Sequence, residues 1–201
     1  MSGKVDQTGN VVLVHGIFDT GAVFRKMSES LIAEGFRTFT PDLTPNSGSR
    51  GLDHLACQLR DYVDLHLPRQ EKFFLVGFSM GGLVCRYYLQ KLEGIRRVAK
   101  FISISSPHNG SRLACALPHT GGRQMRPNSD FINDLNRNAG SLDSLTPVSI
   151  WTPFDLSIVP AESSKMEEFR DVRIPVLLHP WMLTDPKSIE VVIRELKAEL
   201  G

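Results

Sequence analysis

Strand-like stretches and helix-patterned segments alternate along most of this chain, and this alternation constrains its fold more than any other feature. Strands are predicted at 11–14, 36–40, 72–76, 98–104, 147–151 and 174–178. Apolar residues recur at helical spacing in the segments between and after them: 23–34, 52–67, 80–92 and 186–200. This order predicts an α/β fold, with a mostly parallel sheet and helices on both of its faces.

Size and composition predict a single domain over residues 1–201. The 201 residues, 41% of them hydrophobic, suffice for one sizeable core but hardly for two.

A net charge of +1 gives no strong field, so we expect no nucleic-acid partner. No apolar stretch is long enough to span a bilayer, and the start, MSGKVDQTG, lacks the apolar core of a secretory signal. Three widely spaced cysteines fit a reducing, cytoplasmic location and offer no metal spacing: Cys57, Cys85 and Cys115.

One long segment, 107–146, interrupts the alternation. It is rich in Gly, Asn, Pro and Ser and contains one short helical pattern, PNSDFINDLN. Long segments with little regular structure are usually functional or mobile. We therefore expect a partly irregular insertion that flanks the active site.

A serine lies where the strand at 72–76 meets the helix at 80–92. The residues Gly77-Phe78-Ser79-Met80-Gly81 fit the pattern G-x-S-x-G. In such a strand-to-helix turn, the serine takes strained backbone angles and its hydroxyl projects above the sheet. The flanking strand and helix favour Ser79 as a nucleophile over an incidental serine in a glycine-rich turn.

A nucleophilic serine needs a base, and chain order selects one of six histidines. In this architecture the acid and then the histidine follow the serine, on loops after later strands. Three histidines precede Ser79, and two follow it too early: His15, His54, His66, His108 and His119. His179, at the end of the last predicted strand, is the expected base, although a capped surface histidine would also fit there.

The acid and the oxyanion hole are expected on two other loops. Asp155 is the first carboxylate after the strand at 147–151, and we prefer a triad role for it over turn capping. The oxyanion donors are predicted to be the backbone N–H groups of Ile17, after the strand at 11–14, and of Met80, after the nucleophile. We expect His15 and His108 to stabilise loops rather than to act as bases.

Five stretches together resemble the α/β-hydrolase superfamily, and specifically its small bacterial lipases and esterases: VLVHGIF, VGFSMGG, SISSPHNGS, FDLSIVP and VLLHPW. The resemblance implies a compact α/β-hydrolase fold. Because only a short segment precedes the HG strand, the fold is expected to lack the two N-terminal strands. The spacing between strands also leaves no room for a large lid. Phe18, Phe131 and Leu135 are candidates for the substrate pocket, although the last two would equally pack a helix onto the body.

The expected activity is cleavage of a small-molecule acyl ester by a Ser79–His179–Asp155 triad through an acyl-enzyme, with no metal or organic cofactor. The same machinery would serve a thioesterase, an acyltransferase or an amidase. A hydrolase fold retained as a non-catalytic binding protein is the alternative from another class. Transient contact with lipid fits this reading, while acyl length and oligomeric state are open.

Overall fold

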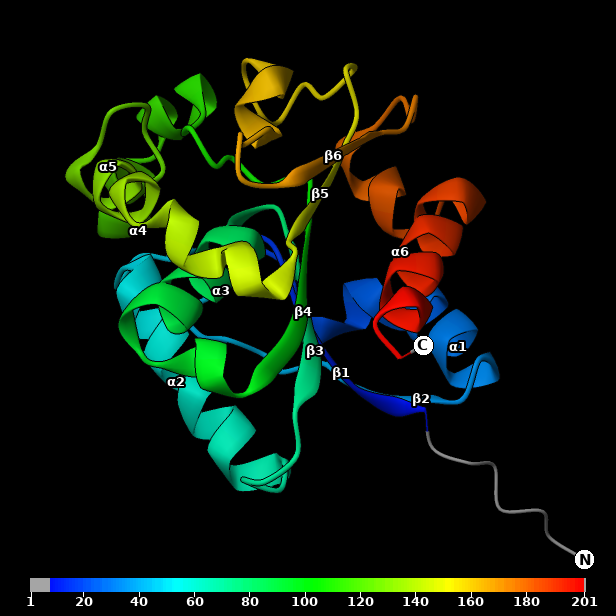
Figure 1. The fold of residues 1–201 in the computed structure, drawn as a ribbon. Coiled ribbons are helices and arrows are strands. Elements are labelled where there is room, and N and C mark those ends of the chain that lie inside the picture. The colour runs from blue at the N-terminus through cyan, green and yellow to red at the C-terminus, as the bar shows by residue number, and fades with distance from the viewer. Residues whose placement is uncertain (1–7, 201) are drawn as a thin grey trace, which may run out of the picture.

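A single parallel sheet forms the centre of the molecule (Figure 1). The structure is a computed structural model and describes residues 8–200, so the predictions made for residues 1–7 lie outside it. Six strands lie in the order β2-β1-β3-β4-β5-β6, and every neighbouring pair is parallel. The strands are β1 (Gly9–Val14), β2 (Phe36–Phe39), β3 (Phe73–Phe78), β4 (Val98–Ile104), β5 (Val148–Trp151) and β6 (Arg170–Arg173). The predicted six-stranded parallel sheet flanked by helices is confirmed.

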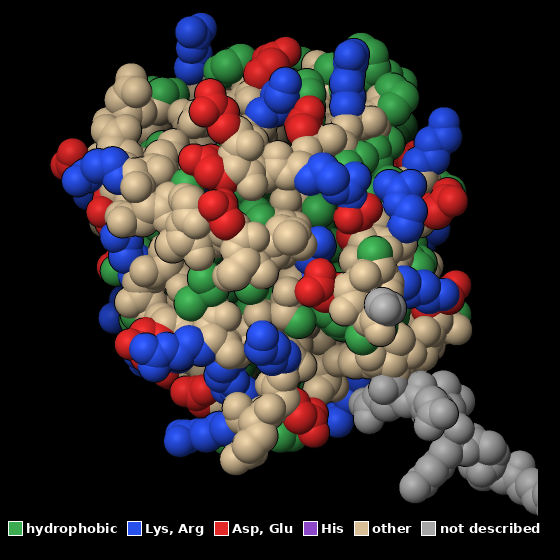
Figure 2. Space-filling model, in the orientation of Figure 1, with side chains coloured by type: hydrophobic (Ala, Val, Ile, Leu, Met, Phe, Trp, Pro, Cys, Tyr) green, Lys and Arg blue, Asp and Glu red, His purple; other side chains and the backbone are tan. Residues whose placement is uncertain are grey.

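Helices cover both faces of this sheet (Figure 1). One face carries α2 (Leu52–His66), α3 (Met80–Lys91), α4 (Thr120–Gln124) and α5 (Asp130–Arg137); the other carries α1 (Arg25–Ala33) and α6 (Pro186–Ala198). None of the helices formed by residues 8–200 combines the length and apolar character needed to cross a membrane. On the face shown in Figure 2, acidic and basic side chains are mixed, in keeping with the small net charge.

The strands are buried from both sides, which explains their apolar sequences. Along β1, Val12 and Val14 belong to the core cluster that contains residues of α2 and α3, whereas Val11 and Leu13 belong to the cluster with α1 and α6. Because successive side chains of a strand point to opposite faces, a central strand between two helical layers needs apolar residues at every position.

Local signals place the ends of several helices. Asp185 caps α6, because its carboxylate accepts hydrogen bonds from the backbone N–H groups of Lys187 (2.9 Å) and Ser188 (3.4 Å). Pro186 occupies the first turn, where its missing N–H has no consequence. Gly35 follows α1 with a φ of 87°, a conformation that glycine adopts readily. The residue types at these three positions are those that helix ends favour.

The last strand is not where the sequence analysis placed it. We predicted a strand at 174–178, but β6 is the charged segment Arg170–Arg173. As an edge strand that pairs only with β5, it needs no continuous apolar run. Pro175 has no N–H to extend the ladder, and Ile174 and Val176 are buried outside regular structure, in the cluster with α6.

The segment 107–146 is more regular than expected. Besides α4 and α5 it contains two 3₁₀ helices, η3 (Arg112–Ala116) and η4 (Ala139–Leu145). Elements this short have too few turns to show an apolar stripe, so sequence periodicity detected α5 alone. The remaining 3₁₀ helices are η1 (Gly21–Phe24), η2 (Gly94–Arg96), η5 (Ala161–Ser164) and η6 (His179–Leu183).

Candidate active site

Ser79 occupies a strained turn between β3 and α3. Its φ of 53° and ψ of −124° lie outside the regions that a non-glycine residue usually adopts. The backbone N–H of Ser79 donates to the carbonyl of Ile104 at 2.8 Å, which ties the turn to β4. Its hydroxyl does not cap the helix that follows. The turn therefore holds Ser79 at the end of the sheet with its hydroxyl free of a structural bond.

The glycines of the motif permit two close backbone approaches. A Cβ on Gly77 would lie 2.6 Å from the Cα of Gly82, and one on Gly81 would lie 2.2 Å from the carbonyl oxygen of Val14. Both distances are far below van der Waals contact. The two glycines are therefore required by the packing of α3 against β1 and against its own strand.

We expect Gly81→Ala to lower the free energy of unfolding by about 1–3 kcal/mol, because the added methyl group would push α3 away from the backbone of β1. Urea denaturation of the variant measures this loss. Gly140→Ala is the control, since the nearest atom to its added Cβ is 4.0 Å away, at Asp143 Oδ2. Equal stability of the two variants would contradict the argument.

Asp155 and His179, from the loops that follow β5 and β6, are hydrogen-bonded to each other. The distance between His179 Nδ1 and Asp155 Oδ2 is 2.7 Å. The other carboxylate oxygen, Oδ1, accepts hydrogen bonds from the backbone N–H groups of Ser157 and Ile158, both at 2.9 Å. Both carboxylate oxygens are thus hydrogen-bonded, and Oδ2 fixes the orientation of the imidazole through Nδ1.

The surroundings keep Asp155 ionised. Burial acts to raise the pKa of this carboxyl, but the hydrogen bond and charge of His179, with the two backbone N–H groups, outweigh burial and lower the pKa. At neutral pH the group is therefore a carboxylate, which suits it to orient and stabilise a protonated imidazole.

Ser79 and His179 meet in one cavity of about 340 Å³. The bond between His179 and Asp155 is formed in this structure, whereas no hydrogen bond among the described residues joins His179 to Ser79. Contacts to a nucleophile are often long before substrate binds. The three predicted triad residues are thus brought together at one edge of the sheet, two of them in direct contact.

The two predicted oxyanion donors are the backbone N–H groups of Ile17 and Met80. Ile17 lines the cavity, and no acceptor for its N–H is found within residues 8–200. Met80 is the first residue of α3, where an N–H group has no partner inside the helix. The geometry therefore leaves both predicted donors free.

His15 holds the loop that presents Ile17. Its Nε2 accepts a hydrogen bond from the backbone N–H of Leu43 (2.9 Å), so Nδ1 carries the proton and donates to the carbonyl of Gly16 (2.8 Å). With both ring nitrogens engaged and the side chain buried, His15 has no nitrogen free for proton transfer. Its predicted structural role is confirmed.

His108 is likewise structural. It is fully buried, with Nε2 2.8 Å from the hydroxyl of Ser103. Burial, assisted by the nearby charge of Arg86, lowers the pKa of His108 well below its usual value, so the ring is neutral.

The predicted substrate-binding residues do not lie in the cavity wall. Leu135 is fully buried in the core, and Phe131 stacks on Tyr87 with ring centroids 5.5 Å apart. Both therefore pack α5 onto the body, which was the other reading open to the sequence. Phe18 is 62% exposed and also lies outside the wall, although its neighbour Ile17 belongs to it.

The apolar part of the wall comes instead from residues that the sequence analysis missed: Leu113, Ala114, Leu117, Met125 and Ile158. Four of them belong to the 107–146 insertion, in and around η3 and the end of α4. In the sequence, the length of that insertion is the one signal for these residues, because residues on such short helices show no periodicity.

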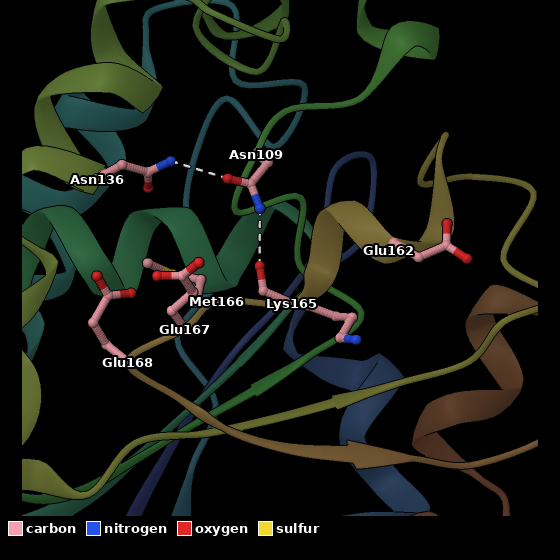
Figure 3. Close-up of a pocket in the computed structure, with 7 residues that line it drawn as sticks. All are labelled: Asn109, Asn136, Glu162, Lys165, Met166, Glu167 and Glu168. Atoms are coloured by element: carbon pink, nitrogen blue, oxygen red, sulfur yellow. Dashed lines mark hydrogen bonds between the residues drawn. The ribbon is translucent and has the colours of Figure 1, made fainter.

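A second cavity, of about 450 Å³, is shown in Figure 3 and shares no lining residue with the first. Asn136 donates to Asn109 (3.2 Å), and Asn109 donates to the carbonyl of Lys165 (2.9 Å), so these amides tie α5 to the segment after η5. Three glutamates complete much of its wall: Glu162, Glu167 and Glu168. Through these amide bonds Asn109 stabilises the loop that follows β4.

A family model described as alpha/beta hydrolase fold matches residues 9–145. The chain therefore belongs to this family, and the resemblance to the α/β-hydrolase superfamily is confirmed. Membership defines a hydrolase-type fold with its site at the ends of the strands, and it leaves the bond that is cleaved open.

Among curated proteins, the lysosomal thioesterase PPT2 of Mus musculus is 33% identical over 104 residues, which cover 50% of this chain and 34% of that protein. The human protein of the same name matches to the same extent. The matched stretch thus spans about a third of the length of these relatives.

Two solved lipase structures share the fold. Lipase BlEst2 of Bacillus licheniformis superposes with a TM-score of 0.76 at 15% identity, covering 95% of this chain and 93% of that chain. Lipase B of Aspergillus fumigatus gives a TM-score of 0.78 at 16% identity, covering 94% of this chain and 52% of that chain. At these identities the likeness concerns the fold alone.

Proposed function

We propose that this chain is a serine hydrolase that cleaves carboxylic esters through a covalent acyl-enzyme. One observation carries the proposal: Ser79 and the hydrogen-bonded pair His179–Asp155, from loops after three different strands, meet at one cavity. A nucleophile, a base and a group that orients the base are the parts that acyl transfer needs.

In the proposed mechanism, His179 takes the proton of Ser79 while the hydroxyl oxygen attacks the ester carbonyl. Asp155 holds the imidazole with Nδ1 protonated, so that Nε2 is the nitrogen that accepts the proton. The N–H groups of Ile17 and Met80 stabilise the oxyanion. The protonated His179 gives its proton to the leaving alcohol. Water, activated by the same imidazole, then attacks the acyl-enzyme and restores Ser79.

The apolar wall supports an uncharged acyl group as the part of the substrate held in the cavity. Leu113, Leu117 and Met125 offer aliphatic and thioether surface, and no Lys or Arg belongs to this wall within the described residues. An aliphatic acyl chain would bury itself there by the hydrophobic effect.

A thioesterase is the second candidate, and the match to lysosomal thioesterase PPT2 favours it. Thioesters pass through the same acyl-enzyme, and the site geometry suits either leaving group. The cytoplasmic location suggested by the sequence stays a prediction, because the mammalian relatives are named as lysosomal. The transient lipid contact also stays a prediction.

A substrate panel tests the proposal. We expect the purified protein to hydrolyse p-nitrophenyl esters and to be labelled by a fluorophosphonate probe at Ser79, as mass spectrometry of the labelled peptide will show. Matched esters, thioesters and amides, with acyl chains from acetyl to palmitoyl, separate the candidate activities. A folded protein that turns over no member of the panel and leaves the probe unreacted would be a binding protein instead.

A further inference from the structure

The cavity around Ser79 contains a carboxylate that the proposed mechanism does not use. Asp19 lines it, two residues after Ile17 in the loop that follows β1. Asp19 Oδ2 lies 3.0 Å, and the Cβ of Ser79 3.1 Å, from the one point where Gly16 would carry a Cβ. The carboxylate and the nucleophile therefore flank Gly16 closely.

The backbone of Asp19 is held by the loop, but its carboxylate is not. The N–H donates to the carbonyl of Gly16 (3.4 Å), and the C=O accepts from Asn46 Nδ2 (2.9 Å). Within residues 8–200, no hydrogen bond or ion pair engages the side-chain oxygens. Partial burial raises the pKa of Asp19, and the neighbouring His15 and His179 act to lower it.

Other aspartates of this protein show what a structural role looks like. Asp42 accepts from the backbone N–H of Gly21 at 2.6 Å, and Asp185 caps α6. Each of those carboxylates closes a loop or begins a helix. Asp19 does neither among the described residues, so its half-buried carboxylate is available to a ligand in the cavity.

The chemistry of the wall indicates which ligand would complete the contact. Asp19 supplies a carboxylate to the lining of the cavity, and no cationic Lys or Arg side chain belongs to that lining. The aromatic ring of Phe78 borders the same space, with its centroid 4.7 Å from that of His179. A carboxylate beside an aromatic ring is a favourable environment for an ammonium group.

We propose that Asp19 recognises a positively charged group on the substrate, so that the site prefers esters of ammonium-bearing alcohols, such as choline esters, over neutral esters of the same shape. This inference rests on the proposed esterase function. The uncharged acyl chain occupies the apolar wall, and the cationic end of the alcohol contacts Asp19.

An isosteric substrate pair tests the inference. Butyrylcholine and 3,3-dimethylbutyl butyrate have the same shape and differ by one positive charge. For the wild type we expect kcat/KM to be roughly tenfold higher for the cationic ester, and we expect Asp19→Asn to remove this ratio. Asp61→Asn is the charge-matched control, since Asp61 is exposed on α2 and pairs with Arg60; it should keep the ratio.

Two further measurements do not depend on the variant's activity. In the wild type, higher salt should lower the cationic-to-neutral ratio, because screening weakens the charge contact. Choline should also bind the wild type in a calorimetric titration and bind Asp19→Asn several-fold more weakly.

A wild type with equal kcat/KM for both esters overturns the inference and leaves the esterase proposal standing. A wild type that binds choline but hydrolyses neither ester overturns the esterase proposal alone. A wild type that does not bind choline overturns the inference.

Discussion

Replacing Ser79 by alanine will lower kcat for p-nitrophenyl ester hydrolysis by roughly 10⁴-fold or more, while the protein stays folded. The reason is chemical: alanine has no nucleophile, so the acyl-enzyme cannot form. The fold should persist because the turn is held by the backbone bond from residue 79 to Ile104, which does not use the hydroxyl. Steady-state kinetics with a mass spectrum of the fluorophosphonate adduct is the measurement.

Ser30→Ala is the matched control for this variant. Ser30 lies on α1, and its hydroxyl donates to the carbonyl of Lys26, one helical turn earlier. The control should keep wild-type kinetics and probe labelling. If Ser79→Ala retained most of its activity with an unchanged far-UV spectrum, another residue would be the nucleophile.

Asp155→Asn will lower kcat by roughly 10⁴-fold with little change in size at the site. The loss of kcat follows from the hydrogen bonds around this side chain. The N–H groups of Ser157 and Ile158 require an acceptor at the position of Oδ1, so the amide oxygen must take that place. The amide NH₂ group then faces His179 Nδ1 and requires it to accept. This forces the proton onto Nε2, the nitrogen that must receive the proton of Ser79.

Nitrogen chemical shifts of His179 will report this change of tautomer directly, alongside the loss of kcat. Asp185→Asn provides the control, because asparagine caps a helix as well as aspartate does and α6 lies outside the cavity. An Asp155→Asn enzyme with wild-type kcat, or with Nδ1 still protonated, would remove Asp155 from the mechanism.

Much of the fold could be predicted because its signals are local. The elements β1, β3 and β4 are buried between two helical layers, so burial shows in their composition. The elbow at Ser79 could be predicted for a similar reason, since two close approaches leave glycine as the residue that fits at Gly77 and Gly81. Chain order and the positions of the predicted strands then led to Asp155 and His179, and the structure places Asp155 Oδ2 2.7 Å from His179 Nδ1.

The wrong predictions concern residues whose structural role depends on neighbours far away in the sequence. β6 lies at the edge of the sheet, where a strand can carry charged residues. The apolar residues that follow it are buried although they do not form a strand. Leu135 was a pocket candidate because its spacing along α5 fits any apolar contact; which contact it makes depends on how α5 packs.

The sequence by itself determined the alternation of strands and helices, the glycine-bounded turn around Ser79 and the order of serine, acid and histidine. Each of these depends on backbone conformation or burial within a few consecutive residues. Only the tertiary structure decided which side chains form the cavity wall and that Asp19 lines the same cavity as Ser79. The physical reason is that a cavity is bounded by segments far apart in the chain, and their relative placement follows from the packing of the whole sheet and its two helical layers.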